Sequence, residues 1–167
     1  MMYTVGAKVV HPCYGAGTIV KIQEKDIGTT IRRYYVIYTM GRPMQLMVAV
    51  DNAQSVGLRD VGPEISLRET LSAGSIAPID GEISADLRGR QMTMRERLKS
   101  GEFSQVVDVV RQLFFLNARR PLGSVDRQLF DQGKDLLAGE LALSCDAEVT
   151  EAMHQIEGVL AHMFGSE

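Results

Sequence analysis

The residues best suited to chemistry lie near the N-terminus, where His11 and Cys13 precede the run Gly15-Ala16-Gly17. A histidine and a cysteine two residues apart could bind zinc, but no further ligand follows at a zinc-site spacing. The glycines could begin a dinucleotide-binding loop, but Val20 occupies the position of its third glycine. A strand-like apolar run follows, where pyrophosphate binding needs a helix N-terminus. We therefore predict a structural corner here, with no metal and no cofactor.

The other reactive side chains also lack a catalytic arrangement. His154 and His162 stand eight residues apart with glutamates nearby, which is typical of the polar face of a helix. The chain contains no P-loop and no nucleophile-elbow motif. Cys13 and Cys145 are far apart, and we expect them to be free, buried thiols. The sequence therefore predicts no catalytic residue and no small-molecule substrate, so we do not expect an enzyme.

Short strands joined by turns are predicted over residues 1–60. Pro12 removes a ladder donor and should end the first strand, while the glycines after it suit a sharp reversal. A polar hairpin loop is expected at residues 24–30, before an aromatic and β-branched strand at 31–38. Another strand, at residues 45–50, has alternating faces. Because no helix separates these strands, we predict a small antiparallel β-barrel.

Helical periodicity replaces the strand pattern in the rest of the chain. Pro63 can open a short helix that runs to Ser72, and the glycines and proline of residues 74–83 predict a flexible connection. We assign residues 61–83 to this helix and linker, and residues 84–167 to an all-helical domain of about five helices. The predicted fold class is therefore α+β, with a β domain followed by a helical domain.

Charge is unevenly distributed along a chain whose net charge is −3. Residues 84–134 contain ten basic and six acidic side chains, whereas residues 135–167 contain seven acidic side chains and no Lys or Arg. A basic middle segment suits contact with phosphate groups, and it suits an ordinary solvated helix surface equally well. There is neither a secretion signal nor an apolar stretch long enough to span a bilayer, so we expect a cytoplasmic protein without membrane contact.

Several blocks of the sequence, in order, are similar to one family of bacterial transcription regulators. The chain resembles the CarD/CdnL family, through these blocks: Val9-Val10-His11-Pro12, Tyr14-Gly15-Ala16-Gly17, Tyr34-Tyr35-Val36-Ile37, Val48-Ala49-Val50, Val56-Gly57-Leu58-Arg59, Arg97-Leu98-Lys99-Ser100-Gly101-Glu102, Val109-Val110-Arg111-Gln112-Leu113 and Leu136-Leu137-Ala138-Gly139-Glu140-Leu141-Ala142. The β domain alone also resembles the polymerase-interaction domain of transcription-repair coupling factors. The helical domain and the lack of helicase motifs favour the short regulator.

The resemblance implies a function in transcription initiation. Such regulators bind the β subunit of RNA polymerase through a Tudor-like N-terminal domain and contact promoter DNA upstream of the −10 element through the helical domain. They thereby stabilise the open promoter complex, without catalysis. The polymerase-facing positions of the family fall on Lys25, Ile27 and Met47, and Ala49 stands where a proline is usual. An exposed edge strand could bind polymerase by β-augmentation.

The DNA-contacting positions of the family are matched unevenly. Leu87 stands where the family has a tryptophan wedge, although it could equally be an ordinary core leucine. Arg90, Arg127 and Lys134 match family basic positions, and Arg88, Arg95 and Arg97 could compensate for others that are missing. We expect weak DNA binding, mainly to phosphates. The alternative is a protein-interaction adaptor of polymerase or another regulator, with little or no DNA contact.

Overall fold

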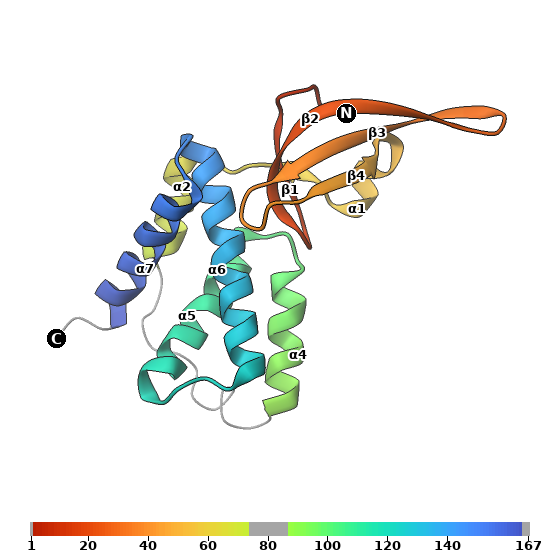
Figure 1. Cartoon of the computed structure of the whole chain (residues 1–167). Helices are drawn as coiled ribbons and strands as arrows, with labels where there is room; N and C mark the ends of the chain where they lie inside the picture. The colour runs from red at the N-terminus through yellow and green to blue at the C-terminus, as the bar shows by residue number, and fades with distance from the viewer. Residues whose placement is uncertain (1, 74–86, 165–167) are drawn as a thin grey trace.

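The computed structural model describes residues 2–73 and 87–164 of the chain. A β-sheet is followed by a group of helices, and the two parts meet along one helix, α6 (Figure 1). The strands are β1 (Lys8–His11), β2 (Gly15–Ile27), β3 (Thr30–Thr39), β4 (Gln45–Ala49) and β5 (Arg59–Asp60). Between β4 and β5 lie the short helices η1 (Val50–Asn52) and α1 (Ala53–Val56). The predicted α+β class is confirmed.

The five strands form an antiparallel sheet in the order β4-β3-β2-β1-β5. Within the described residues β4 pairs only with β3, and β5 pairs only with β1. The sheet is therefore open, and the predicted closure into a barrel is not confirmed. The physical reason lies in β5, which is two residues long and too short to bridge back to the other edge.

The hairpin between β2 and β3 differs from the prediction. Its loop is Gly28-Thr29, because both strands continue through the polar residues expected to form a longer loop at 24–30. Backbone pairing continues to Ile27 and Thr30, and the left-handed φ of +83° at Gly28 suits the two-residue turn that joins them. The hairpin therefore projects as a long two-stranded arm beyond the rest of the sheet (Figure 1).

The predicted corner after Pro12 is confirmed, and its two glycines serve different purposes. Gly15 has a φ of +89°, a left-handed conformation that favours glycine. Gly17 is needed for space, because a Cβ atom there would lie 2.6 Å from the carbonyl oxygen of Tyr38 on β3. A Cβ on Gly15 would also meet Leu136 of α6 at 3.0 Å, so the corner packs directly against the helices.

The helices share one apolar core. They are α2 (Glu64–Ser72), α4 (Leu87–Leu98), α5 (Phe103–Arg119), α6 (Ser124–Cys145) and α7 (Val149–Phe164). Buried leucines of α6, including Leu137 and Leu141, pack against α5 and α7, as the helical spacing predicts. Four helices follow residue 84 in the described chain, and α2 adds a fifth to the same core.

Helix α2 is part of the helical core. Its Leu67 and Leu71 are buried in that core, and Arg111 of α5 donates to the carbonyl oxygens of Thr70 and Leu71 at 2.8 and 2.7 Å. Bonding of the last carbonyls by an arginine is a common way to end a helix. The predicted linker at 74–83, like the expected domain start at Ser84, lies outside the described residues.

Candidate interaction surfaces

The three positions that the resemblance assigns to polymerase lie on one face of the sheet. Lys25 stands opposite Arg32 in the ladder, and Met47 stands opposite Val36. Opposed residues project to the same face, and so do alternate residues along a strand. Ile27, two residues after Lys25, therefore shares this face too. We call it the outer face, because Tyr35, Ile37 and Val48 fill the core on the other side.

Both apolar residues of this set are accessible. Ile27 is 50% exposed near the tip of the arm, and Met47 is 42% exposed on β4. Strand β4 is also an edge strand within the described chain, with β3 on one side and an unpaired row of backbone groups on the other. An exposed edge beside apolar side chains can accept an extended segment of another protein.

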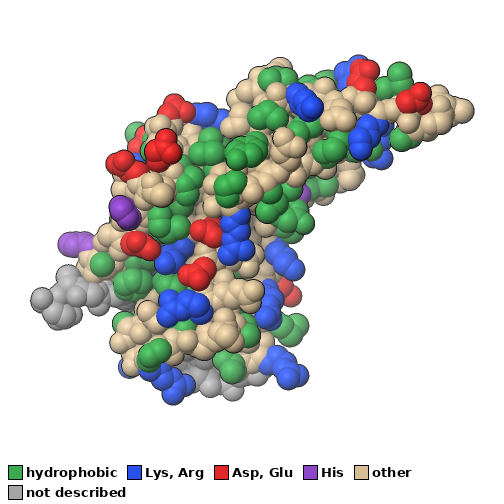
Figure 2. All heavy atoms as spheres, in the orientation of Figure 1, with side chains coloured by type: hydrophobic (Ala, Val, Ile, Leu, Met, Phe, Trp, Pro, Cys, Tyr) green, Lys and Arg blue, Asp and Glu red, His purple; other side chains and the backbone are tan. Residues whose placement is uncertain are grey.

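Three exposed basic residues, two on α4 and one directly after it, lie along one side of the helix together with Met92. Arg88, Met92, Arg95 and Lys99 follow one another at intervals of four, three and four residues, which places them on one side of the helix. All four are exposed, and none of the basic three has an ion pair within residues 2–73 and 87–164. We call this set the α4 stripe. Figure 2 shows Lys and Arg side chains spaced along the right-hand edge of the helical part, which α4 forms in Figure 1.

The α4 stripe and the residues expected to contact DNA overlap only in part. Lys99 belongs to this stripe although the sequence does not single it out; the basic side chains at i, i+7 and i+11, counted from Arg88, are the signal that identifies it. Arg97 lies off the stripe and is half-buried. Arg127 is exposed on α6, with a single long hydrogen bond of 3.4 Å to Asn117.

Arg90 is directed into the protein. Its guanidinium makes two hydrogen bonds, of 3.1 and 2.9 Å, to the carboxylate of Asp126 in the first turn of α6. Gln91 donates to the same carboxylate at 3.0 Å. The side chains of Arg90 and Asp126 are 8% and 12% exposed, so the pair is nearly buried. In this structure Arg90 fastens α4 to α6 and does not present its charge to solvent.

Lys134 is also engaged within the protein. Its Nζ atom lies 3.1 Å from a carboxylate oxygen of Glu157 on α7 and 4.5 Å from the centre of the Phe130 ring. Its side chain is only 16% exposed. A lysine that bridges two helices in this way would have to break both contacts to reach a phosphate.

Leu87 is exposed at the start of α4. It is 60% accessible, so the alternative interpretation as a core leucine is wrong. Together with Phe115 and Leu116 it lines an open hollow of about 1130 Å³ at the end of the helical part. Leu87 is therefore an exposed apolar side chain beside the first residue of the α4 stripe.

The reactive residues near the N-terminus have structural roles. The imidazole Nδ1 of His11 accepts a hydrogen bond of 3.1 Å from the backbone N–H of Cys13, which stabilises the corner. Burial lowers the pKa of His11, so the neutral form that accepts this bond is favoured. Both cysteines are free, but the expectation that both are buried is wrong, since Cys13 is exposed. Within the described residues, no group of three or more His, Cys, Asp or Glu could hold a metal ion.

Stability should depend on pH through Asp126. Burial by itself would raise the pKa of Asp126, but hydrogen bonds from Arg90 and Gln91 and the charge of Arg90 outweigh it and hold the pKa below 3.8. A carboxylate with a lowered folded-state pKa stabilises the fold above its unfolded-state pKa and loses this contribution as pH falls through the folded-state pKa. We expect the free energy of unfolding of Asp126→Asn to change less between pH 5 and pH 2 than that of the wild type. Urea titrations at a series of pH values measure it, and equal pH dependence in the two proteins would contradict the prediction.

Comparisons with known proteins identify the relatives of this chain. The model of the CarD-like/TRCF RID domain, an RNA polymerase-interacting domain, matches residues 3–62, and that of the CarD C-terminal domain matches residues 79–157. The chain is also 26% identical over 140 residues to the proposed transcription factor YdeB of Bacillus subtilis (strain 168), covering 84% of this chain and 90% of YdeB. None of the described helices is long and apolar enough to cross a membrane. The two matched domains stand in the family's order and span most of the sequence, and the chain belongs to the CarD family of transcription regulators, which interact with RNA polymerase.

Proposed function

We propose that this protein binds the β subunit of RNA polymerase through the outer face and the β4 edge of its sheet. Through the α4 stripe it contacts promoter DNA upstream of the −10 element, and it thereby stabilises the open promoter complex. The observation that carries the proposal is the presence of two exposed surfaces in a CarD-family chain. One is an apolar sheet face with a free edge, and the other is a basic helix face.

The sheet offers affinity and specificity from different groups. The unpaired backbone of β4 can form main-chain hydrogen bonds with an extended segment of polymerase. Met47 and Ile27 add apolar contacts on the outer face, and Lys25 adds a charge beside them. Because Lys25 and Met47 stand where relatives often have arginine, these two positions cannot pair with a carboxylate in a bidentate manner. Apolar burial and backbone pairing supply most of the binding energy instead.

The helical part offers contacts with the DNA backbone. Arg88, Arg95 and Lys99 lie along one side of α4, where successive phosphates of a duplex can be reached. Such contacts add salt-sensitive affinity without reading the base sequence. Choice of promoter therefore comes from polymerase. Leu87, exposed at the end of the α4 stripe, can press against a base step, and because it lacks an aromatic ring it acts as a weaker wedge than tryptophan.

Polymerase binding tests the first half of the proposal. Met47→Glu places a charge in the apolar part of the interface and should abolish capture of the polymerase β subunit. The double variant of Met47→Glu with Lys25→Glu should show the same loss. Met47 is exposed, so the fold should tolerate the change. Ile31→Glu is the matched control, because Ile31 is 65% exposed on the same arm but projects to the opposite face. Capture by both Met47→Glu and the double variant would show that the outer face is not the docking surface.

A second function is favoured by one observation. Two of the predicted DNA contacts, Arg90 and Lys134, are held in ion pairs inside the protein. An adaptor that binds polymerase or another regulator without contacting DNA does not need exposed basic side chains at these two positions. The two functions differ in their requirement for the α4 stripe, whose charges the DNA-contacting regulator needs and the adaptor does not.

A further inference from the structure

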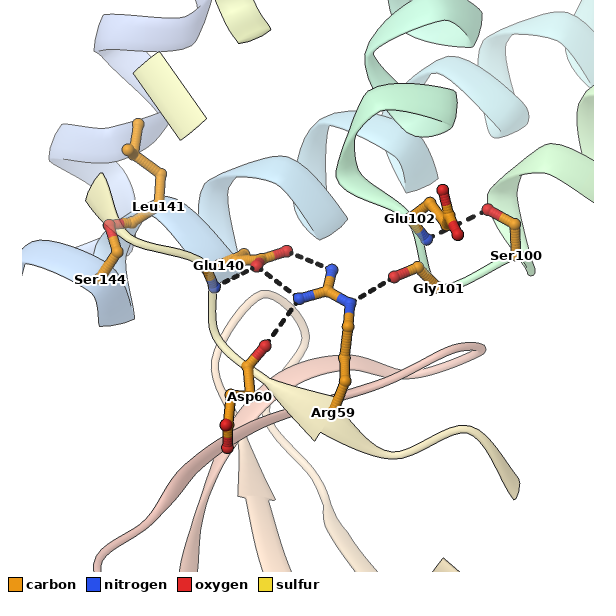
Figure 3. Close-up of polar contacts among 9 residues, drawn as sticks. Arg59, Asp60, Ser100, Gly101, Glu102, Glu140, Leu141 and Ser144 are labelled. Carbon is orange, nitrogen blue, oxygen red and sulfur yellow. Dashed lines mark hydrogen bonds and ion pairs between the residues drawn. The ribbon is translucent and has the colours of Figure 1, made fainter. Parts of the chain in front are cut away.

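One arginine connects the sheet to the helices at the junction between the two parts. Arg59 lies in β5 at the edge of the sheet, and its guanidinium points towards the helices (Figure 3). It makes two hydrogen bonds with the carboxylate of Glu140 on α6, of 2.8 and 2.9 Å. Its Nε donates to the carbonyl oxygen of Gly101 at 2.6 Å, in the turn between α4 and α5. One side chain thus holds β5, α6 and the end of α4 together.

The carboxylate of Glu140 depends on this arrangement. Its side chain is only 4% exposed, and a buried carboxylate is strongly unfavourable unless it is paired and hydrogen-bonded. Arg59 supplies the charge, and the backbone N–H of Gly62 donates a third hydrogen bond of 2.8 Å. All three bonds come from the segment that leaves the sheet. Glu140 is satisfied only while that segment is seated on α6.

The other polar contacts at the junction are weaker. Arg42 pairs with Asp135 at 2.8 Å and Lys8 with Asp146 at 2.7 Å, but the Arg42 side chain is 56% exposed and that of Asp146 is 83% exposed. Exposed pairs of this kind contribute little to stability or geometry. The contact among Arg59, Glu140 and Gly101, which we call the junction clamp, contains the most buried of these three ion pairs, with side chains 34% and 4% exposed, and its bidentate geometry defines an orientation as well as an attraction.

The junction clamp lies between the two proposed binding surfaces. Gly101 lies in the turn that follows α4, three residues after Leu98, so the bond from Arg59 holds the chain just beyond the helix that carries the α4 stripe. On the other side, β5 pairs with β1 in the same sheet that carries Met47. We propose that Arg59 and Glu140 are positioning residues, which hold α4 at one angle to the sheet so that polymerase binding presents the α4 stripe to DNA. This inference rests on the proposed function.

The benefit of a fixed angle is thermodynamic. Once the sheet has bound polymerase, DNA contact is an intramolecular step whose strength depends on how well the two surfaces are held in register. A loose junction would have to be ordered when DNA binds, and the free energy of that ordering would be lost from the complex. The clamp removes this loss without touching either partner.

The test compares two conservative variants with a matched control. Arg59→Lys keeps the positive charge but loses the planar guanidinium group, so the lysine cannot donate hydrogen bonds to both Glu140 and Gly101 in the same geometry. Glu140→Gln keeps the size and loses the charge. Both variants should bind the polymerase β subunit with an affinity within about twofold of wild type. We nevertheless expect them to shorten the protein-dependent lifetime of the open complex at least about fivefold, which is a small part of the affinity that linking two binding sites can add. Arg42→Lys, at the exposed pair of the same junction, should behave as wild type.

Distances between spin labels provide a readout of the angle that does not depend on activity. Labels at Ile31→Cys and Met92→Cys, in a Cys13→Ser and Cys145→Ser background, report the position of α4 relative to the sheet. We expect a narrow distance distribution that broadens with Arg59→Lys and with Glu140→Gln but not with Arg42→Lys. An unchanged distribution, or a broadened one with normal open-complex lifetime, would overturn the inference.

The remaining outcomes separate the clamp from the proposed function. If the wild-type protein does not prolong open-complex lifetime, the proposed function fails and this inference fails with it. If the wild type is active and both clamp variants are equally active, only the clamp is refuted. Loss of the folded state in both variants would also refute it, because Arg59 and Glu140 would then be required for folding and not for the angle.

Discussion

Reversal of the three charges of the α4 stripe is expected to remove most of the effect of this protein on the open complex. In a variant with Arg88→Glu, Arg95→Glu and Lys99→Glu, we expect the concentration that gives half-maximal extension of open-complex lifetime to rise on the order of 100-fold at 0.1 M salt. Each phosphate contact contributes nearly one decade through counterion release under these conditions. The dependence of log affinity on log salt should become less steep by about three.

The fold should tolerate this change. All three side chains are exposed and have no ion pair within the described parts of the chain. Arg68→Glu on α2 is a suitable control, because Arg68 is also an accessible arginine, and its ion pair is with Glu64 one turn earlier on its own helix. Polymerase binding should be the same in all these proteins. A triple variant with normal activity and an unchanged salt dependence would exclude DNA contact by the α4 stripe and would favour the adaptor.

Replacement of Arg90 is expected to act on stability instead. We expect Arg90→Met to lower the free energy of unfolding by about 3 kcal/mol, at the lower end of the range for breaking a buried pair. The change leaves the carboxylate of Asp126 nearly buried with only Gln91 as a side-chain donor. The position of Asp126 in the first turn of α6 limits the loss, because the helix N-terminus stabilises an anion. Urea denaturation measures the effect.

The double variant Arg90→Met with Asp126→Leu separates the charge from the packing. Removal of both partners leaves no unpaired buried charge, and such replacements are often close to neutral. We therefore expect the double variant to regain most of the stability that Arg90→Met loses. If Arg90→Met is as stable as wild type and its DNA contact is weaker, the ion pair seen in the structure is dispensable and Arg90 is a DNA ligand after all.

Local features of the fold follow from local sequence patterns. The alternation at 45–50 predicts that Met47 projects outward and Val48 inward, and the structure has Val48 in the core of the sheet. The spacing of the apolar residues of α5 predicts its buried face, and Gly101 marks the stop after α4. These features depend on neighbours within one turn or one strand, where side-chain periodicity directly reflects which face is buried.

Other features depend on partners far along the chain and could not be predicted. The sheet remains open because only two residues of β5 pair with β1, and the arm is long because β2 and β3 stay paired as far as Ile27 and Thr30. Asp126 lies 36 residues from Arg90, and Glu140 lies 81 residues from Arg59. Arg59 and Glu140 each stand in a block that resembles the CarD family, but no periodicity connects them.

The sequence by itself determined four of the strands, the change from strands to helices and the family, but not β5 or the short helices η1 and α1. Only the tertiary structure decided which charges are available. Arg88 and Arg90 are two residues apart and identical in type, but they project to different sides of α4, so that one faces solvent and the other meets Asp126. A sequence reports that a charge is present, whereas its partner depends on how helices pack. For the same reason, Lys134 counts as basic in the sequence and is neutralised by Glu157 in the fold.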